Sequence, residues 1–216
     1  MYATSKKNKN LALFDFDGTL CNKDSFTGFI FHALSKRHIV KQGIKILPWI
    51  QAHYLNAYSA PAMRSKLFRA MFTDANALEL NTLAQEYAAQ LMSQLNSSLF
   101  KQLKQHQTLG DDVVLVSASI DIYLESVCEL LEIDLICTQT ETIDHVYTGH
   151  YVSPDCSSEQ KRLRILEKYN PDEYASIYAY GNSHEDNEML ALADYRYMVG
   201  RDKALPELAL AIQIAI

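Results

Sequence analysis

The segment "LALFDFDGTL", residues 11 to 20, joins an apolar run of strand length to two acidic residues and a Gly. Successive side chains of a strand alternate between faces, so Asp15 and Asp17 are expected to point to the same side. We expect both at the carboxyl end of a strand, where open α/β sheets bind ligands. The alternatives are an Asp-Gly turn or a calcium loop. An EF-hand loop is excluded because Phe26 stands where that loop needs a Glu.

Further apolar runs of strand length follow, with helical patterns between the later ones. This alternation is typical of a parallel α/β sheet. The predicted fold class is therefore α/β with a Rossmann-like parallel core. We expect the strands at residues 11–16, 113–116, 135–137, 177–180 and 195–199.

The long segment between the first two strands has no convincing strand of its own. Its apolar residues recur at helical spacing, which predicts an inserted helical cap at residues 23–104 and a core made of residues 1–22 and 105–216. The segment "TQTETIDHVYTGHYV" alternates around Thr148-Gly149, which predicts a small hairpin at the sheet edge. The helical spacing is seen in Leu78, Leu80, Leu83, Tyr87, Leu91 and Leu95.

Composition limits the partners and the compartment. A chain of 216 residues with 48% hydrophobic residues can bury a core of ordinary size. A net charge of -6 argues against nucleic acid, because no surplus of basic residues exists to neutralise phosphates. The four cysteines form no C-x-x-C pair, and "MYATSKKNKN" precedes too short an apolar run for a signal peptide. We therefore expect a cytoplasmic protein.

One uncharged segment, "ILPWIQAHYLNAYSAPAM" at residues 46–63, is the only candidate for membrane contact. Its polar interruptions make it a poor spanning helix, since spanning needs about 20 predominantly apolar residues. We expect a cap helix, with peripheral membrane contact through the cap as the alternative.

Three later segments place polar residues where a strand ends or a helix begins. "VVLVSAS" supplies Ser117, "CSSEQKRLRIL" supplies Lys161, and "YAYGNSHEDNEML" supplies Asn182 and Asp186. Hydroxyl and N–H groups at a strand end suit a phosphoryl oxygen, and oxygen ligands suit Mg²⁺. The alternatives are a turn at Ser117, a solvated basic helix face at Lys161, and a capping box of Ser183 with Asp186.

The four segments, in this order, resemble the motifs of the haloacid dehalogenase superfamily of aspartate-nucleophile phosphatases. The order and the insertion after the first motif are similar to the phosphoserine-phosphatase-like branch, subfamily IB, over essentially the whole chain. The resemblance implies a phosphomonoester hydrolase in which Asp15 forms an aspartyl phosphate and Asp17 acts as general acid and base. It further implies that Ser117, Ala118 and Lys161 bind the phosphoryl group. The implied Mg²⁺ ligands are Asp15, the backbone carbonyl of Asp17, Asn182 and Asp186.

The chain departs from this family at position 182. Members usually carry a coordinating Asp there, whereas Asn182 keeps an oxygen of similar reach without the negative charge. The sequence predicts a magnesium site that persists but is weakened, because Mg²⁺ often binds through one or two carboxylates plus phosphate. A catalytically weak phosphate-binding relative is the alternative.

The substrate is expected to be a small phosphate ester. Asp24 stands where phosphoserine phosphatases carry a substrate-binding Glu, and Arg64 or Arg69 is a candidate partner for a substrate carboxylate. These positions favour a small metabolite such as phosphoserine, although Asp24 can also simply start a helix. "KDSFTGFI" and the region around Pro48-Trp49 resemble the phosphatidylglycerophosphatase C family, which leaves a lipid phosphate as the alternative.

Overall fold

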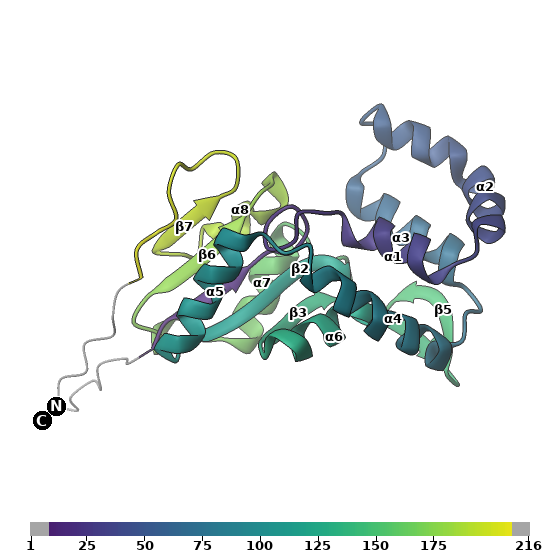
Figure 1. The fold of residues 1–216 in the computed structure, drawn as a ribbon. Helices are drawn as coiled ribbons and strands as arrows, with labels where there is room; N and C mark the ends of the chain where they lie inside the picture. Colours follow the sequence, from purple (N-terminus) through teal and green to yellow (C-terminus); the bar gives the residue numbers. More distant parts are fainter. Residues whose placement is uncertain (1–8, 209–216) are drawn as a thin grey trace, which may run out of the picture.

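The computed structural model describes residues 9–208, which form a five-stranded sheet flanked by helices and joined to a helical insertion (Figure 1). The strand order is β3-β2-β1-β6-β7, and every neighbouring pair is parallel. The predicted α/β class with a Rossmann-like sheet is confirmed. The strands are β1 (Leu11–Phe14), β2 (Asp112–Ile120), β3 (Asp134–Thr138), β6 (Ile177–Gly181) and β7 (Tyr195–Met198).

Side-chain alternation along β1 supplies both faces of the sheet with apolar contacts. Ala12 and Phe14 belong to one core cluster, and Leu11 and Leu13 belong to the other. A strand buried on both faces reads as a continuous apolar run, which is why the sequence pattern was clear. The first cluster is covered by α5 (Ser97–Leu109) and α6 (Asp121–Leu131), and the second by α7 (Glu159–Lys168) and α8 (Asn187–Leu190).

Helices α1 to α4 lie between β1 and β2 in the sequence. Figure 1 shows α1, α2 and α3 grouped at one end of the molecule, beyond the sheet. α4 packs along α6, and α5 packs on β2. We therefore propose that the inserted unit consists of α1 to α4, and that α5 belongs to the core. The inserted helices are α1 (Ser25–Ala33), α2 (Lys36–Tyr54), α3 (Ala60–Phe72) and α4 (Ala77–Met92).

The two connections between the insertion and the core run side by side. The backbone N–H of Asn22 donates to the carbonyl of Gln94 at 3.1 Å, and that of Asn96 donates to the carbonyl of Leu20 at 2.8 Å. The chain thus leaves the sheet and returns to it at one place.

A two-stranded hairpin, β4 (Thr140–Ile143) and β5 (Val146–Tyr151), projects from the core as expected. Its turn lies at Asp144-His145, where both residues have positive φ, so the predicted turn at Thr148-Gly149 is wrong. Gly149 lies inside β5.

The hairpin also contacts the insertion. The backbone N–H of Tyr147 donates to the carbonyl of Ala75, and the N–H of Asp74 donates to the carbonyl of Tyr147, both at 3.0 Å. These two bonds join β5 to the loop between α3 and α4.

The uncharged segment at residues 46–63 is divided between the end of α2, a loop and the start of α3. Within residues 9–208, none of the helices combines the length and apolarity needed to cross a bilayer. Residues 1–8, on which the expectation about a signal peptide depended, lie outside the described residues.

Candidate active site

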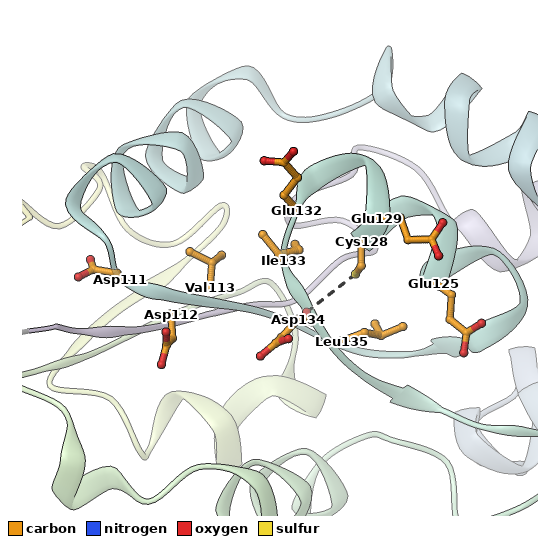
Figure 2. Close-up of a pocket in the computed structure, with 10 residues that line it drawn as sticks. All are labelled: Asp111, Asp112, Val113, Glu125, Cys128, Glu129, Glu132, Ile133, Asp134 and Leu135. Atoms are coloured by element: carbon orange, nitrogen blue, oxygen red, sulfur yellow. Dashed lines mark hydrogen bonds between the residues drawn. The ribbon is translucent and has the colours of Figure 1, made fainter.

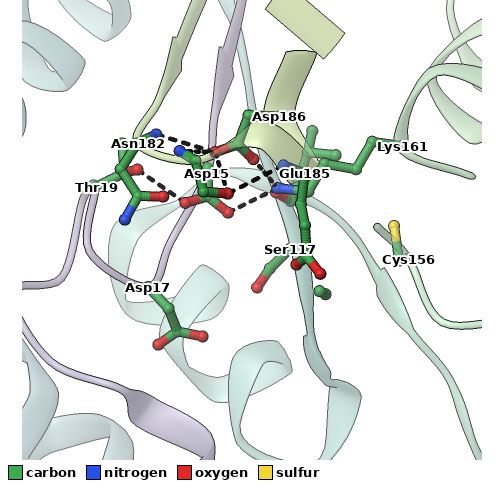
Figure 3. A network of polar contacts seen from close by, with 12 residues as sticks. Asp15, Asp17, Thr19, Ser117, Cys156, Lys161, Asn182, Glu185 and Asp186 are labelled. Atoms are coloured by element: carbon green, nitrogen blue, oxygen red, sulfur yellow. Dashed lines mark hydrogen bonds and ion pairs between the residues drawn. The ribbon is translucent and has the colours of Figure 1, made fainter. Parts of the chain in front are cut away.

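Asp15, Lys161 and Asp186 meet at the carboxyl end of the sheet (Figure 3). Asp15 directly follows β1, Lys161 extends from α7, and Asp186 ends the 3-10 helix η2 (His184–Asp186). The Lys161 Nζ donates to Asp15 Oδ1 at 2.7 Å, to Asp186 Oδ1 at 2.6 Å and to the carbonyl of Val116 at 2.9 Å. All three ammonium donors are therefore used, which compensates a side chain that is only 1% exposed.

Burial and charge act in opposite directions on this trio. Burial disfavours the Lys161 charge, yet the attraction of Asp15 and then Asp186 raises the pKa of Lys161. Burial would also raise the pKa of Asp186, but Lys161 and the N–H groups of Ser183 and Asn182 hold that pKa below its usual range. For Asp15 burial is the larger effect and, against the attraction of Lys161, raises its pKa to about 6. Asp15 is therefore mainly an ionised carboxylate at neutral pH.

Asp17 has a different environment and points away from this trio (Figure 3). Its Oδ2 accepts from Ser119 Oγ at 2.5 Å, and its Oδ1 accepts from the backbone N–H of Ser25 at 2.7 Å. Burial raises the pKa of Asp17, opposed by these bonds from Ser119 and Ser25. Because β1 ends at Phe14, the turn after the strand, and not strand alternation, positions Asp17.

The last residues of β2 place Ser117 and Ala118 in the cavity that Asp15, Asp17 and Lys161 also line. Pairing of β2 with β3 is irregular between Ser117 and Ile120, where the Ala118 carbonyl accepts from Thr138 Oγ1 at 2.8 Å. The Ser117 Oγ is buried and accepts from the backbone N–H of Ser119 at 3.1 Å. A strand irregularity at a site re-aims side chains, which here face the cavity.

Asn182 lies against the turn that follows β1. A Cβ added to Gly18, whose φ is +77°, would lie 2.0 Å from Asn182 Nδ2, so Gly is required for this close approach. Among residues 9–208 neither atom of the Asn182 amide has a hydrogen-bond partner, whereas its backbone N–H donates to Asp186 Oδ2 at 2.9 Å. The Asn182 side chain is thus free to offer its oxygen.

The oxygen ligands available in this cavity suit Mg²⁺, but the neutral Asn182 amide leaves them with less negative charge than a site with an aspartate at that position. The described residues contain no group of three or more His, Cys, Asp or Glu side chains placed to hold a metal. Asp186 gives one oxygen to Lys161 and the other to the N–H groups of Asn182 and Ser183, which forms the anticipated capping box. Asp186 Oδ2 accepts three hydrogen bonds, from Asn182 and Ser183, whereas each Asp15 oxygen accepts one and keeps a lone pair. We therefore propose Asp15, the Asp17 carbonyl and Asn182 as the direct ligands.

One cavity of about 470 Å³ joins the sheet edge to the insertion, and every site residue predicted from the sequence except Arg69 lines it. Asp24 caps α1 by accepting from the Thr27 N–H at 3.0 Å, so it both starts a helix and borders the cavity. Arg69 does not line it. The predicted residues brought together are Asp15, Asp17, Asp24, Arg64, Ser117, Ala118, Lys161, Asn182 and Asp186.

Arg64 is already paired. Its Nε and Nη2 donate to the two oxygens of Asp155 at 2.8 and 2.9 Å, and its Nη2 also donates to Glu185 Oε1 at 3.1 Å. Such a bidentate arrangement uses the guanidinium fork that would otherwise hold a carboxylate. Arg64 therefore connects α3 to the loop before α7 and to η2 in the core.

Sequence reasoning missed four residues of this site. Thr19 Oγ1 donates to Asp15 Oδ2 at 2.8 Å, Ser119 holds Asp17, and Asp155 and Glu185 hold Arg64. Thr19, Ser119 and Glu185 lie inside the motif segments, so their polarity beside a motif was a usable signal. Asp155 carried none.

A second hollow, of about 620 Å³, lies at the opposite end of β2 and β3 (Figure 2). Asp112 and Asp134, at the amino ends of these strands, border it together with acidic residues of α6. None of the predicted site residues lines it.

A buried lysine held between two aspartates, with a third aspartate in the same cavity at the carboxyl end of a parallel sheet, is the arrangement expected of a phosphate-ester hydrolase. The family match and a curated phosphatase relative confirm the predicted enzyme class, a phosphatase. More specifically, the chain belongs to the haloacid dehalogenase-like hydrolases, because the model of that family matches residues 12–191.

Two curated relatives cover most of the chain. A histidinol-phosphatase of Neisseria meningitidis serogroup C (strain 8013) is 28% identical over 212 residues, which are 91% of this chain and 93% of the relative. Protein CicA of Caulobacter vibrioides (strain NA1000 / CB15N) is 27% identical over 201 residues, which are 89% of this chain and 87% of the relative.

Solved structures share the fold. A protein with unknown function from Bordetella pertussis Tohama I has a TM-score of 0.70 at 20% identity, covering 88% of this chain and 89% of that one. A phospho-aspartyl intermediate analogue of phosphoserine phosphatase has a TM-score of 0.57 at 19% identity, covering 88% and 86%. At these identities the likeness supports the fold alone.

Proposed function

We propose that the protein is a Mg²⁺-dependent phosphomonoester hydrolase that acts through an aspartyl phosphate. The observation that carries the proposal is the different setting of two carboxyl groups in one cavity: Asp15 lies 2.7 Å from the Lys161 Nζ, whereas Asp17 is held by Ser119 and has no cation beside it. A carboxylate beside a fixed cation is suited to the nucleophilic role, and a separate carboxyl group in the same cavity is suited to the acid–base role.

In the first step an Asp15 oxygen attacks phosphorus, the P–O ester bond breaks, and Asp17 gives its proton to the leaving oxygen. In the second step Asp17 removes a proton from water, the water oxygen attacks phosphorus, and the Asp15–phosphorus bond breaks to release phosphate. The Ser117 hydroxyl can donate to a phosphoryl oxygen, and the Lys161 charge, held against Asp15, offsets the negative charge of the phosphoryl group that Asp15 carries.

Mg²⁺, held by Asp15, the Asp17 carbonyl and the Asn182 oxygen, would supply positive charge against the phosphoryl group. Asp186 serves this site indirectly, by holding Lys161 and the backbone of Asn182 in place. Charge neutralisation and positioning are the main requirements of phosphoryl transfer.

The mechanism is tested with 4-nitrophenyl phosphate and with an alkyl phosphate, each assayed with Mg²⁺ and with EDTA. Asp15→Asn is expected to abolish turnover of both esters. Asp17→Asn should slow the alkyl ester by roughly 10²- to 10⁴-fold and the aryl ester far less, because a good leaving group needs little protonation. Exposed Asp172→Asn is the matched control, and turnover that survives in Asp15→Asn or in EDTA would contradict the mechanism.

For the substrate we propose a small phosphate ester whose leaving group carries an amine and no carboxylate. The expectation of phosphoserine required a free arginine, whereas Arg64 is paired with Asp155 and Glu185. Asp24 contributes an acidic group on the cap side of the cavity, Glu185 contributes a carboxylate from the core side, and Phe26 adds an apolar wall. Histidinol phosphate, the ester implied by the name of the Neisseria relative, has this chemistry.

The cavity size supports a metabolite over the lipid alternative. A volume of about 470 Å³ falls in the range of small-molecule sites, about 300–1,000 Å³, and leaves little room for two acyl chains. We keep the cytoplasm as the proposed compartment; all four cysteines are buried free thiols.

Substrate choice is tested by comparing kcat/KM for histidinol phosphate, phosphoserine and glycerol phosphate. We expect the highest kcat/KM for histidinol phosphate, whose leaving group carries an amine and no carboxylate. Glu185→Gln should reduce kcat/KM for histidinol phosphate but not for glycerol phosphate. Asp155→Asn is the matched control, since it also removes a partner of Arg64 but does not line the cavity. A preference for phosphoserine in the wild-type enzyme would show that Arg64 exchanges its partners for the substrate carboxylate.

A further inference from the structure

α2 lies at the outer edge of the insertion (Figure 1) and carries a row of exposed apolar side chains. Val40, Ile44 and Leu47 are spaced at i, i+4 and i+7, which places them on one side of the helix, and they are 61%, 68% and 47% exposed. Lys41 and Lys45 follow two of them directly in the sequence and are also exposed. We call these five residues the outer face of α2.

The charge of this helix is opposite in sign to that of the whole protein. α2 contains Lys36, Arg37, Lys41 and Lys45 and no acidic residue, whereas the chain has a net charge of -6. Among residues 9–208 none of these four cations forms an ion pair. The positive charge is therefore available to an external partner.

We propose that the outer face of α2 adsorbs to an anionic lipid surface. An apolar row flanked by basic residues lies in the boundary between headgroups and acyl chains, where both kinds of side chain are accommodated. A second copy of the chain is a poor occupant, because a symmetric contact would bring Lys41 and Lys45 of both copies together with no carboxylate from α2. A nucleic acid would leave Val40, Ile44 and Leu47 unused.

The same helix continues to the active-site cavity. Ile50, His53 and Tyr54 line that cavity, and Tyr54 is 81% exposed. Adsorption through α2 would thus place the cap side of the cavity close to the bilayer. The proposal concerns where the enzyme works and is independent of the ester that it hydrolyses.

The chain contains one tryptophan, Trp49, which lies on α2 and provides a local probe. The indole ring is stacked under Lys66, whose Nζ lies 3.9 Å from the ring centroid. The full-length protein is titrated with vesicles of equimolar phosphatidylglycerol and phosphatidylcholine, and with vesicles of phosphatidylcholine alone. We expect cosedimentation with the anionic vesicles only. Because Trp49 lies on the side of α2 opposite Val40 and is covered by Lys66, its emission should stay nearly unchanged when the outer face of α2 adsorbs.

Two variants separate charge from apolar contact. Lys41→Gln/Lys45→Gln should weaken binding to the anionic vesicles roughly 30-fold, since each basic residue near such a surface contributes about fivefold. Ile44→Ser should also weaken binding. The matched controls are Lys101→Gln/Lys203→Gln and Leu78→Ser, which remove exposed lysines and an exposed leucine elsewhere.

Three outcomes would overturn the proposal. They are no binding to anionic vesicles, equal binding by the α2 variants and their controls, and equal binding to neutral vesicles. Light scattering is run in parallel without vesicles. A dimer that Ile44→Ser dissociates would assign the outer face of α2 to a second copy of the chain and likewise reject the lipid surface.

Discussion

At the scale of single residues, the amide at position 182 controls how tightly the proposed magnesium site binds. Asn182→Asp adds one negative charge beside the cation with little change in size. We expect Mg²⁺ to bind about 10- to 100-fold tighter, the range seen when groups around a metal are altered. Activity at saturating Mg²⁺ should change little. The measurement is a Mg²⁺ titration of activity and of binding by calorimetry in both proteins.

The same titration distinguishes an enzyme with weak metal affinity from an inactive phosphate binder. If the protein is an enzyme, the wild type should need a high Mg²⁺ concentration but reach the same maximal turnover as the variant. If it is an inactive phosphate binder, only the Asn182→Asp variant should show turnover. Asn187→Asp, an exposed change five residues further on, controls for added surface charge. Equal Mg²⁺ affinity in wild type and Asn182→Asp would show that residue 182 does not face the cation.

A buried polar network on the other side of the core makes stability depend on pH. Asp111 Oδ2 accepts from His106 Nδ1 at 2.7 Å, and its Oδ1 accepts from the backbone and side chain of Asn10. Burial would raise the pKa of Asp111, but these bonds prevail and lower it. A lowered pKa in the folded state means that the carboxylate stabilises the fold above the unfolded-state pKa of about 3.9.

This contribution is lost as the pH falls below about 4 through the lowered pKa of folded Asp111. Asp111→Asn should reduce the free energy of unfolding by about 1–3 kcal/mol at neutral pH, because buried hydrogen bonds lose their charged partner. The difference from wild type should shrink between about pH 5 and pH 3. Urea unfolding across this range measures it, and a difference that stays constant would exclude titration of Asp111 as the cause.

The site residues that could be predicted from the sequence are those that short segments of sequence are enough to identify. Asp15 and Asp17 follow a strand that periodicity locates, whereas Lys161 was selected among the basic residues of its helix by the resemblance to the haloacid dehalogenase superfamily. Ser119 reaches Asp17 across 102 positions of the chain, and Asp155 reaches Arg64 across 91, so only the folded structure reveals these pairs. The ion pairs of Arg64 with Asp155 and Glu185 led us to replace phosphoserine by an amine ester as the proposed substrate. The sequence alone does not show which carboxylate pairs with a given arginine.

At the scale of elements, the hairpin is positioned by a glycine inside β5 and not by one at its turn. Gly149 has φ +80°, and a Cβ there would lie 2.1 Å from Thr73 Oγ1 on the α3 side. Gly110 has φ +78° with open space around it. Both positions therefore share the conformational requirement, but only Gly149 is crowded.

Gly149→Ala should destabilise the protein more than Gly110→Ala. Left-handed backbone costs a non-glycine residue about 1–2 kcal/mol, and Gly149→Ala adds a displacement of the insertion from the hairpin. Chemical unfolding gives the two free energies, and hydrogen exchange at Asp74 and Tyr147 reports the contact. If both variants lose the same free energy of unfolding, the contact between Gly149 and Thr73 adjusts to the added methyl group at no extra cost.

Elements were predicted well where burial produces a strong pattern and poorly where turn chemistry is unusual. The core strands are apolar on both faces and therefore evident. The hairpin turn uses Asp144 and His145 at positive φ, without the glycine that normally marks such turns, while Gly149 drew attention to the wrong place. The proposed end of the insertion after α4 differs from the predicted end at residue 104 because α5 has the same helical periodicity as α4.

At the scale of the whole molecule, Arg64 joins the insertion to the core across the cavity. Its side chain is 21% exposed, and that of its partner Asp155 is 6% exposed. Arg64→Gln leaves a nearly buried carboxylate without its cation, so the free energy of unfolding should fall by about 3 kcal/mol. Arg69→Gln, an exposed change on the same helix, should alter it by less than about 0.5 kcal/mol. Thermal and urea unfolding compare the two, and similar small losses would show that water replaces the ion pair.

The paired connections at Leu20–Asn22 and Gln94–Asn96 make the insertion exchangeable. Because backbone hydrogen bonds join the two ends of the insertion, another helical segment whose ends lie equally close together can replace it without moving the sheet. A chimera that carries the helical segment of a relative between Asn22 and Gln94 would keep the catalytic groups of this chain and acquire a foreign lid.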